Sequence, residues 1–173
     1  MELIAKHDCI YIIDDNTHSL TVLKNLLLDL NYSVRVANRG SVAIKSILMD
    51  PPDLIILDLI MPDMDGYEVC KELRNNQNTK DIPIIFVSAL DEIESKVKAL
   101  NTGGNDYITK PFDLDELCAR MRALQRRSVE RSKPVLAYGD ITLDPAAHLV
   151  SKAGEEIMLS RREFALLQKL LEN

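Results

Sequence analysis

A short apolar run that ends on a carboxylate constrains the fold of this chain more than any other stretch. Residues 54–57 are all apolar, and Asp58 follows them directly. Such a run is typical of a strand buried on both faces of a parallel sheet. Pro62 and the pair Asp65-Gly66 then interrupt regular structure. Asp58 is therefore predicted at the carboxyl end of a buried strand, where ligands of open α/β sheets bind.

Similar apolar runs alternate with amphipathic helical patterns over most of the chain. The predicted strands are 9–13, 33–37, 53–57, 84–87 and 106–109. The predicted helices are one that Asn16 caps and others over 41–49, 66–75, 92–101 and 113–127. This alternation predicts an α/β fold, in which right-handed βαβ crossovers build a doubly wound, five-stranded parallel sheet with helices on both faces.

The pattern changes after a polar segment, residues 128–134, which ends in proline and is interpreted as a linker. Ser160 and Glu163 then form a capping box at the start of an amphipathic helix. Between the linker and this helix, apolar and polar residues alternate with period two in three predicted strands, over 140–143, 148–151 and 156–159. A short antiparallel β segment and one helix are therefore expected at the C-terminal end.

Charge is distributed unevenly between these two parts. Residues 1–125 hold 13 Lys and Arg against 20 Asp and Glu, a balance of −7, whereas residues 126–173 hold 8 against 7, a balance of +1. An acidic first part is a poor DNA binder by itself but suits a hard cation. No apolar run approaches the ~20 residues of a membrane span, and no signal peptide is evident. A cytoplasmic location without membrane contact is therefore expected.

Polar residues follow four of the five predicted strands at their carboxyl ends. They are Asp14-Asp15, Asp58, Ser88 and Lys110. Parallel strands bring these ends to one edge of the sheet, where each pair of carboxylates repels by about 4 kcal/mol at ~4 Å and an effective dielectric constant near 20. A bound Mg²⁺, which prefers oxygen ligands and often binds one or two carboxylates together with a phosphate, removes this repulsion. The sequence predicts a site for a phosphoryl group beside a divalent cation.

The remaining chemistry of this edge fits phosphoryl transfer. A carboxylate such as Asp58 can attack phosphorus to give an acyl phosphate. Lys110 can pair with a carboxylate or with a phosphoryl oxygen, and Ser88 offers a hydroxyl donor. Spreading the charge of the transferred group is most of the catalytic work in such reactions.

These residues stand in motifs that resemble the receiver domain of two-component response regulators, over about residues 8–126. The matching motifs are Asp14-Asp15, Asp58 followed by Met61-Pro62-x-Met64-Asp65-Gly66, Ser88, and Tyr107-x-x-Lys110-Pro111-Phe112. The resemblance implies a flavodoxin-like fold with strand order 2-1-3-4-5, and Gly66 takes a structural position in it. It also implies that Asp58 accepts a phosphoryl group from a sensor histidine kinase.

The resemblance further implies roles for the neighbours of Asp58. Asp15, Asp58 and the Ile60 carbonyl would coordinate Mg²⁺, and Asp14 would help directly or through water. Lys110 and Ser88 would contact the phosphoryl oxygens, and the Lys110-Pro111 bond would be cis. Ser88 and Tyr107 would form the switch pair, in which Ser88 moves toward the phosphate and Tyr107 swings inward behind it.

The tail is similar to the opening of an OmpR/PhoB-type winged-helix DNA-binding domain. The similarity covers Tyr138 through Leu167. The implied organisation is a receiver over 1–126, a linker over 127–134, and a partial effector domain over 135–173 that lacks the recognition helix and wing. Transcription regulation and DNA binding are accordingly expected of a full-length form only. The same family implies a homodimer through 92–101, 105–109 and 113–127, with Asp106 and Arg120 paired across it.

Two alternatives stand beside this interpretation. The chain could be a stand-alone receiver, or one with an output other than DNA binding, because residues 98–107 also resemble such receivers. It could instead be a Mg²⁺-dependent phosphohydrolase that uses Asp58 as a turnover nucleophile. Phosphohydrolases of the haloacid-dehalogenase type want an acid two residues after the nucleophile, and Ile60 stands there. The expected protein is therefore a switch and not a turnover enzyme, with chemistry limited to gaining and losing the phosphoryl group on Asp58.

Overall fold

The computed structural model describes residues 8–132, 135–145 and 149–171. These residues form two compact units, the first ending at Gln125 and the second beginning at Arg126. Within the described ranges, no helix combines the length and the apolar character that crossing a membrane requires.

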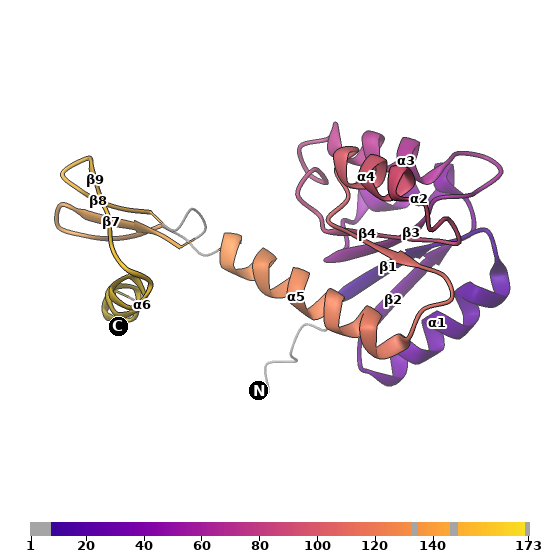
Figure 1. Ribbon diagram of the computed structural model, residues 1–173, viewed down its shortest axis with the longest axis horizontal. Helices are drawn as coiled ribbons and strands as arrows, with labels where there is room; N and C mark the ends of the chain where they lie inside the picture. The colour runs from indigo at the N-terminus through magenta and orange to yellow at the C-terminus, as the bar shows by residue number, and fades with distance from the viewer. Residues whose placement is uncertain (1–7, 133–134, 146–148, 172–173) are drawn as a thin grey trace. The chain divides into compact units, whose positions relative to one another are not determined.

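The first unit alternates strands and helices along the chain (Figure 1). Its strands are β1 (Cys9–Ile13), β2 (Ser33–Ala37), β3 (Leu54–Asp58), β4 (Ile84–Ser88) and β5 (Asp106–Thr109). Its helices are α1 (Thr17–Asp29), α2 (Gly40–Met49), α3 (Gly66–Arg74), α4 (Ile93–Asn101) and the first part of α5 (Leu114–Ser132), which continues past Gln125. Every predicted element is present, with bounds within about one residue of those predicted except in α5, which continues to Ser132. Residues 127–132 of the predicted linker are thus helical.

The five strands form one parallel sheet in the order β2-β1-β3-β4-β5, which confirms the predicted fold class. The most apolar strands occupy its centre: every residue of β3 and of β4 is buried. In the edge strand β2, apolar residues alternate with polar ones, and the strand is only partly buried. This difference in burial follows directly from the difference in hydrophobic pattern.

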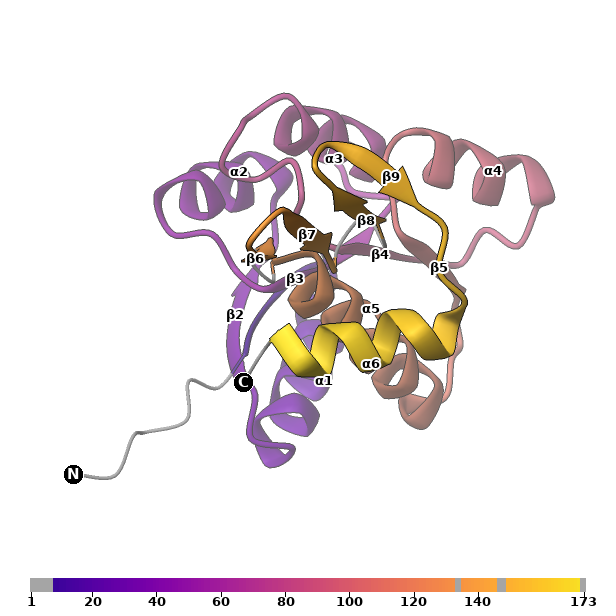
Figure 2. The ribbon, with the colours of Figure 1, turned by 90° about the vertical axis from the view of Figure 1, so that its left-hand side faces the viewer.

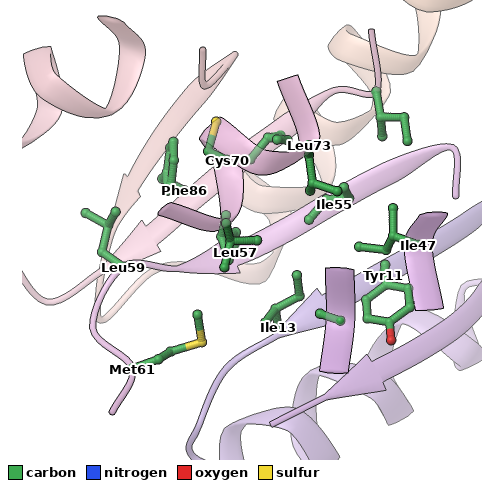
Figure 3. Packing of buried hydrophobic residues seen from close by; sticks show 14 of the residues in the cluster. Tyr11, Ile13, Ile47, Ile55, Leu57, Leu59, Met61, Cys70, Leu73 and Phe86 are labelled. Atoms are coloured by element: carbon green, nitrogen blue, oxygen red, sulfur yellow. The ribbon is translucent and has the colours of Figure 1, made fainter. Parts of the chain in front are cut away.

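Two apolar cores cover the two faces of the sheet. Figures 1 and 2 show α2, α3 and α4 on one face of the sheet and α1 and α5 on the other. One core lies beneath the first three helices, and the other lies beneath α1 and α5. Figure 3 shows the first core, where Ile55 and Leu57 of β3 pack with Cys70 and Leu73 of α3. Each such aliphatic side chain stabilises the fold by about 1.5–3 kcal/mol on burial. The sheet edge that carries the polar residues therefore rests on a rigid support.

The second unit contains a small antiparallel sheet and one helix. Its strands, in sheet order, are β6 (Leu136–Tyr138), β7 (Ile141–Asp144), β8 (Leu149–Lys152) and β9 (Glu155–Ile157), and its helix is α6 (Arg161–Leu171). The antiparallel segment and helix confirm the prediction, although β6 was not predicted because three residues show no clear alternation. His148, in the second predicted strand of this segment, lies outside the described residues.

Side chains of this unit converge on a small core of its own. Leu143, Val150 and Phe164 are its buried members. The predicted capping box is present at α6, since the Ser160 N–H donates to Glu163 and the Glu163 N–H donates to the Ser160 hydroxyl. The α6 face that carries Phe164 therefore packs on the sheet.

Candidate functional site

The register of the parallel strands brings the predicted site residues of β1 and β3 together. Ile13 pairs with Leu57, so the residues that follow them, Asp14 and Asp58, lie at neighbouring strand ends. Because β1 and β3 are both apolar up to this point, the carboxylates are the first polar groups at the carboxyl edge of the sheet.

The same register extends across β4 and β5. Asp58 pairs with Val87, and Ser88 pairs with Thr109. Lys110 comes directly after Thr109, and its N–H donates to the Ser88 carbonyl at 2.7 Å. Four neighbouring strands thus contribute to one edge, as the sequence predicted.

Three carboxylates form the acidic part of this edge. Asp14, Asp15 and Asp58 each offer one oxygen, and these oxygens all lie within 4.8 Å of one another. Asp14 and Asp58 are buried, whereas Asp15 is exposed. Clustered carboxylate oxygens are the donor set of a hard divalent cation. The cluster fits such an ion, and without one its carboxylates repel one another strongly.

Lys110 supplies the opposing charge. Its Nζ lies 2.8 Å from Asp14 Oδ2 and 3.0 Å from Asp58 Oδ2, so one ammonium bridges two carboxylates. The peptide bond from Lys110 to Pro111 is cis. Through its contact with Asp58 Oδ2, the ammonium stands where it can contact a group added to that carboxylate.

The acidic edge holds more negative than positive charge, since it has three carboxylates and one lysine ammonium. Burial raises the pKa of Asp58 above its ordinary value, and the charge of Asp14 adds to this, although Lys110 opposes both. Burial would lower the pKa of Lys110, but its hydrogen bonds to Asp14 and Asp58 prevail and raise it. The two directions agree, because a single ammonium cannot fully compensate two buried carboxylates.

The loop after β3 folds back tightly on Asp58. The Ile60 N–H donates to Asp58 Oδ1 at 3.3 Å, and the Gly66 N–H donates to the Leu59 carbonyl at 2.9 Å. A Cβ atom on Gly66 would lie 2.4 Å from the Asp58 carbonyl oxygen, so this position requires glycine. The backbone of Ile60 is thereby held beside the phosphoacceptor candidate while its side chain is exposed.

Ser88 and Tyr107 are both buried and both contact Leu90. The Ser88 hydroxyl accepts a hydrogen bond from the Leu90 N–H at 3.2 Å. The Tyr107 hydroxyl donates to the Leu90 carbonyl at 2.7 Å. The predicted switch pair is therefore connected through the main chain between β4 and α4.

Asp106 and Arg120, predicted to pair across a dimer, pair within one chain in this structure. Arg120 Nη1 donates to both carboxylate oxygens of Asp106 at 2.9 Å, and its Nε and Nη2 donate to Glu116. The contact between dimer partners stays a prediction.

A cavity of about 640 Å³ reaches the acidic edge. Its wall is mostly apolar and comes from α1, from the carboxyl-end parts of β1, β3 and β4, and from the β5–α5 connection; Val22, Leu26 and Phe112 are among its residues. Asp58 and Lys110 also line it. The reactive edge is therefore accessible from an apolar groove.

Two residues of the site were not predicted. Asp63, the unspecified position of Met61-Pro62-x-Met64-Asp65-Gly66, accepts hydrogen bonds from the start of α2. Leu90 takes part through its backbone only. The run Pro62-Asp63 at a turn could have drawn attention to Asp63 as a cap, whereas nothing in the side chain of Leu90 marks its contacts.

Comparison with known proteins gives the family. Residues 10–122 match the model of the response regulator receiver domain. The chain belongs to the response regulators. Over 167 residues it is 40% identical to the response regulator MprA of Mycobacterium avium, a match that covers 95% of this chain and 72% of MprA.

Two solved structures extend the comparison. The response regulator DrrB of Thermotoga maritima, an OmpR/PhoB homolog, is 28% identical with a TM-score of 0.60, over 96% of this chain and 73% of DrrB. The receiver domain of the sensor histidine kinase PA1611 of Pseudomonas aeruginosa, solved with a magnesium ion in its active-site cleft, is 30% identical with a TM-score of 0.65, over 69% of this chain and 98% of that domain. The fold and the acidic edge thus belong to a signalling protein.

Proposed function

We propose that this response regulator is a phosphorylation-controlled switch in which Asp58 accepts a phosphoryl group from a histidine of a sensor kinase. One observation carries the proposal: a buried carboxylate at a strand end is flanked by further carboxylates within 4.8 Å and by a lysine Nζ at 3.0 Å. This arrangement joins a nucleophile, oxygen ligands for a cation and a positive charge for a phosphoryl oxygen.

In the transfer, an Asp58 carboxylate oxygen attacks the phosphorus of the phosphohistidine. The new O–P bond forms as the P–N bond breaks, and the electron pair leaves with the imidazole nitrogen. Lys110 exchanges a carboxylate oxygen for a phosphoryl oxygen, and the Ser88 hydroxyl turns from Leu90 to donate to another. Charge stabilisation of this kind accounts for most of the catalysis in phosphoryl transfer.

The acidic edge also holds Mg²⁺ in this proposal. Asp15, Asp58 and the Ile60 carbonyl would be its ligands, and Asp14 would bind it directly or through water. When bound, Mg²⁺ neutralises charge on the carboxylates and on the phosphoryl group. The magnesium ion in the active-site cleft of the related PA1611 receiver supports the choice of this ion.

The groove beside Asp58 suits the kinase as a partner. An amphipathic helix that carries the phosphohistidine could lay its apolar face against Val22, Leu26 and Phe112. Its histidine would then reach Asp58, which lines the same cavity. A cytoplasmic location is part of the same proposal.

The output of the switch is transcription regulation by a DNA-binding form. The OmpR/PhoB relationship of DrrB, which this chain matches over 96% of its length, supports this role. The proposed domain boundaries are receiver 1–126, linker 127–134, whose residues 127–132 continue α5, and effector segment 135–173. Phosphorylation would favour a homodimer through α4, β5 and α5, in which Arg120 exchanges its intrachain Asp106 for the partner's Asp106.

The test is treatment of the chain with beryllofluoride or acetyl phosphate in the presence of Mg²⁺. We expect wild type to gain the mass of one phosphoryl group from acetyl phosphate and to shift toward a dimer with either reagent. Asp58→Asn is the matched control, because it keeps the size of the side chain and removes the nucleophile. Equal responses of the two proteins would overturn the proposal.

The same experiment separates a switch from a hydrolase. A switch holds the phosphoryl group on Asp58 and turns over slowly, because the exposed Ile60 cannot act as an acid. Rapid and repeated hydrolysis of a phosphate ester, lost in Asp58→Asn, would show a phosphohydrolase instead.

A further inference from the structure

We propose that Asp63 is a positioning residue for the metal side of the site, because it fastens the loop that carries the Ile60 carbonyl to the start of α2. The inference rests on the proposed function, in which that carbonyl is a Mg²⁺ ligand. Asp63 itself would not contact the ion; it would act through the loop backbone.

The side chain of Asp63 makes its hydrogen bonds to another element, the start of α2. Its Oδ1 accepts from the Gly40 N–H at 3.3 Å, and its Oδ2 accepts from the Ser41 N–H at 3.2 Å and the Ser41 hydroxyl at 3.0 Å. The residue at the ordinary capping position, Arg39, makes no side-chain cap. Asp63 therefore caps α2 from a distant part of the sequence.

An ionised carboxylate suits this position. Burial opposes ionisation of Asp63, but the hydrogen bonds from Ser41 and Gly40 prevail and hold its pKa below the ordinary value. The positive end of the α2 dipole favours the same charge. The cap is therefore retained under the conditions in which Asp58 is ionised.

The two ends of the loop are held by other means, which leaves Asp63 to fix its middle. At the first end, Leu59 and Met61 insert into the core beneath α2 and α3 (Figure 3). At the second end, Asp65 forms a capping box with Glu68 at the start of α3. Asp63 lies between these anchors and makes the polar contacts to α2.

The packing at α2 leaves little room for the loop to move inward. A Cβ atom on Gly40 would lie 2.6 Å from Val69 Cγ2 and 3.3 Å from Met64 Cβ. The helix and the loop are thus already in close contact, and the Asp63 bonds resist movement outward. Together they fix the path of the backbone from Met64 back to Ile60.

Mg²⁺ is sensitive to such positioning. It demands near-ideal octahedral geometry with ligands at about 2.0–2.1 Å, so a small displacement of one carbonyl weakens binding. Groups that orient a metal ligand typically change affinity by about 10–100-fold when they are removed. Asp63 should fall at the lower end of this range, because it acts on a backbone segment that has two further anchors.

The experiment is a calorimetric Mg²⁺ titration of the full chain, in wild type, Asp63→Ala and Arg35→Ala. We expect Mg²⁺ affinity to fall by about tenfold in Asp63→Ala. Arg35→Ala is the matched control, because Arg35 binds the other end of α2 through the Ser46 and Asp50 carbonyls. It should destabilise α2 while leaving Mg²⁺ affinity unchanged.

A second readout distinguishes positioning from a general loss of structure. With beryllofluoride present, the response measured is the shift toward a dimer. The Mg²⁺ concentration that gives half of this shift should rise in Asp63→Ala, while the shift at saturating Mg²⁺ should equal that of wild type. Ser41→Ala, which removes one of the three hydrogen bonds, should give a smaller rise. This variant keeps the test informative if Asp63→Ala does not fold.

Unchanged Mg²⁺ affinity in folded Asp63→Ala, or an equal loss in Arg35→Ala, would overturn the inference while the proposed function stands. Absence of Mg²⁺ binding in wild type would instead remove the proposed function itself.

Discussion

Ser88 and Tyr107 bind the N–H and the carbonyl of the same residue, Leu90, at 3.2 Å and 2.7 Å. Movement of either side chain therefore alters a hydrogen bond of one short backbone segment. That segment leads directly into α4, which begins at Ile93. The two residues predicted to act together as a switch thus have a direct physical connection.

Tyr107→Phe should weaken this connection without emptying the core, because it removes the hydroxyl alone. The Leu90 carbonyl loses its partner, so the free energy of unfolding should fall by about 1 kcal/mol. Hydrogen exchange across residues 90–101 should also change less on addition of beryllofluoride than in wild type. Identical exchange responses in the two proteins would contradict the role of this hydrogen bond.

Lys110→Met should destabilise the metal-free protein. It leaves Asp14 and Asp58 without their shared ammonium, and loss of hydrogen bonds to charged groups costs about 2 kcal/mol. Mg²⁺ should recover part of this loss, because the cation takes over the compensating charge. Urea unfolding with EDTA and with Mg²⁺ measures both effects.

Lys96→Met is the control for that comparison. Lys96 pairs with Asp91 on the surface, and exposed pairs of this kind contribute at most about 1 kcal/mol. The free energy of unfolding of Lys96→Met should change with Mg²⁺ as that of wild type does. If Lys110→Met loses no more stability than Lys96→Met and gains no more from Mg²⁺, the contacts of Lys110 with Asp14 and Asp58 stabilise the fold no more than a surface pair does.

The pKa of Asp58 sets a pH dependence of stability. Because this pKa is raised in the folded state, the folded metal-free protein binds the proton more readily than the unfolded chain. Ionised Asp58 therefore lowers stability at neutral pH, and this penalty fades as the pH falls through the folded-state pKa. In EDTA, Asp58→Asn should be more stable than wild type at neutral pH, and the difference should shrink in acid.

Urea unfolding of both proteins at a series of pH values measures this difference. If Asp58→Asn is the less stable protein at neutral pH, the surroundings of Asp58 favour the ionised carboxylate, and its pKa is not raised by folding. Mg²⁺ should reverse the order, because only wild type retains the full ligand set.

Gly66→Ala should damage the site more than its size implies. The added methyl group would meet the Asp58 carbonyl oxygen at 2.4 Å and Leu59 Cα at 2.9 Å, both backbone atoms. Overpacking of this kind costs about 1–3 kcal/mol, and the shift should displace Ile60. Thermal unfolding and Mg²⁺ titration should both show losses, and normal Mg²⁺ affinity would show that the loop adapts elsewhere.

The sheet and its reactive edge could be predicted because they depend on strong and local patterns. Apolar runs such as 54–57 mark buried strands, and the polar residue after each run marks the strand end. Once the strands are parallel, their register brings Asp14, Asp58 and Lys110 together without further information.

Other features could not be predicted because they depend on loop paths and on weak local preferences. The contacts of Leu90 use backbone atoms, and those of Asp63 reach a helix some 20 residues earlier in the chain. The strand β6 has three residues and no usable periodicity. In α5, polar residues after Arg127 resemble a linker, yet they include good helix formers such as Glu130 and Arg131, and the helix continues.

The acidic edge has a consequence for anyone who wishes to engineer this protein. Asp14, Asp15 and Asp58 are held near one another against their mutual repulsion. A screen for heat-resistant variants would therefore select neutral replacements at these positions early, and such variants would lose the proposed chemistry. Selection should be carried out with Mg²⁺ present, or with these three positions held constant.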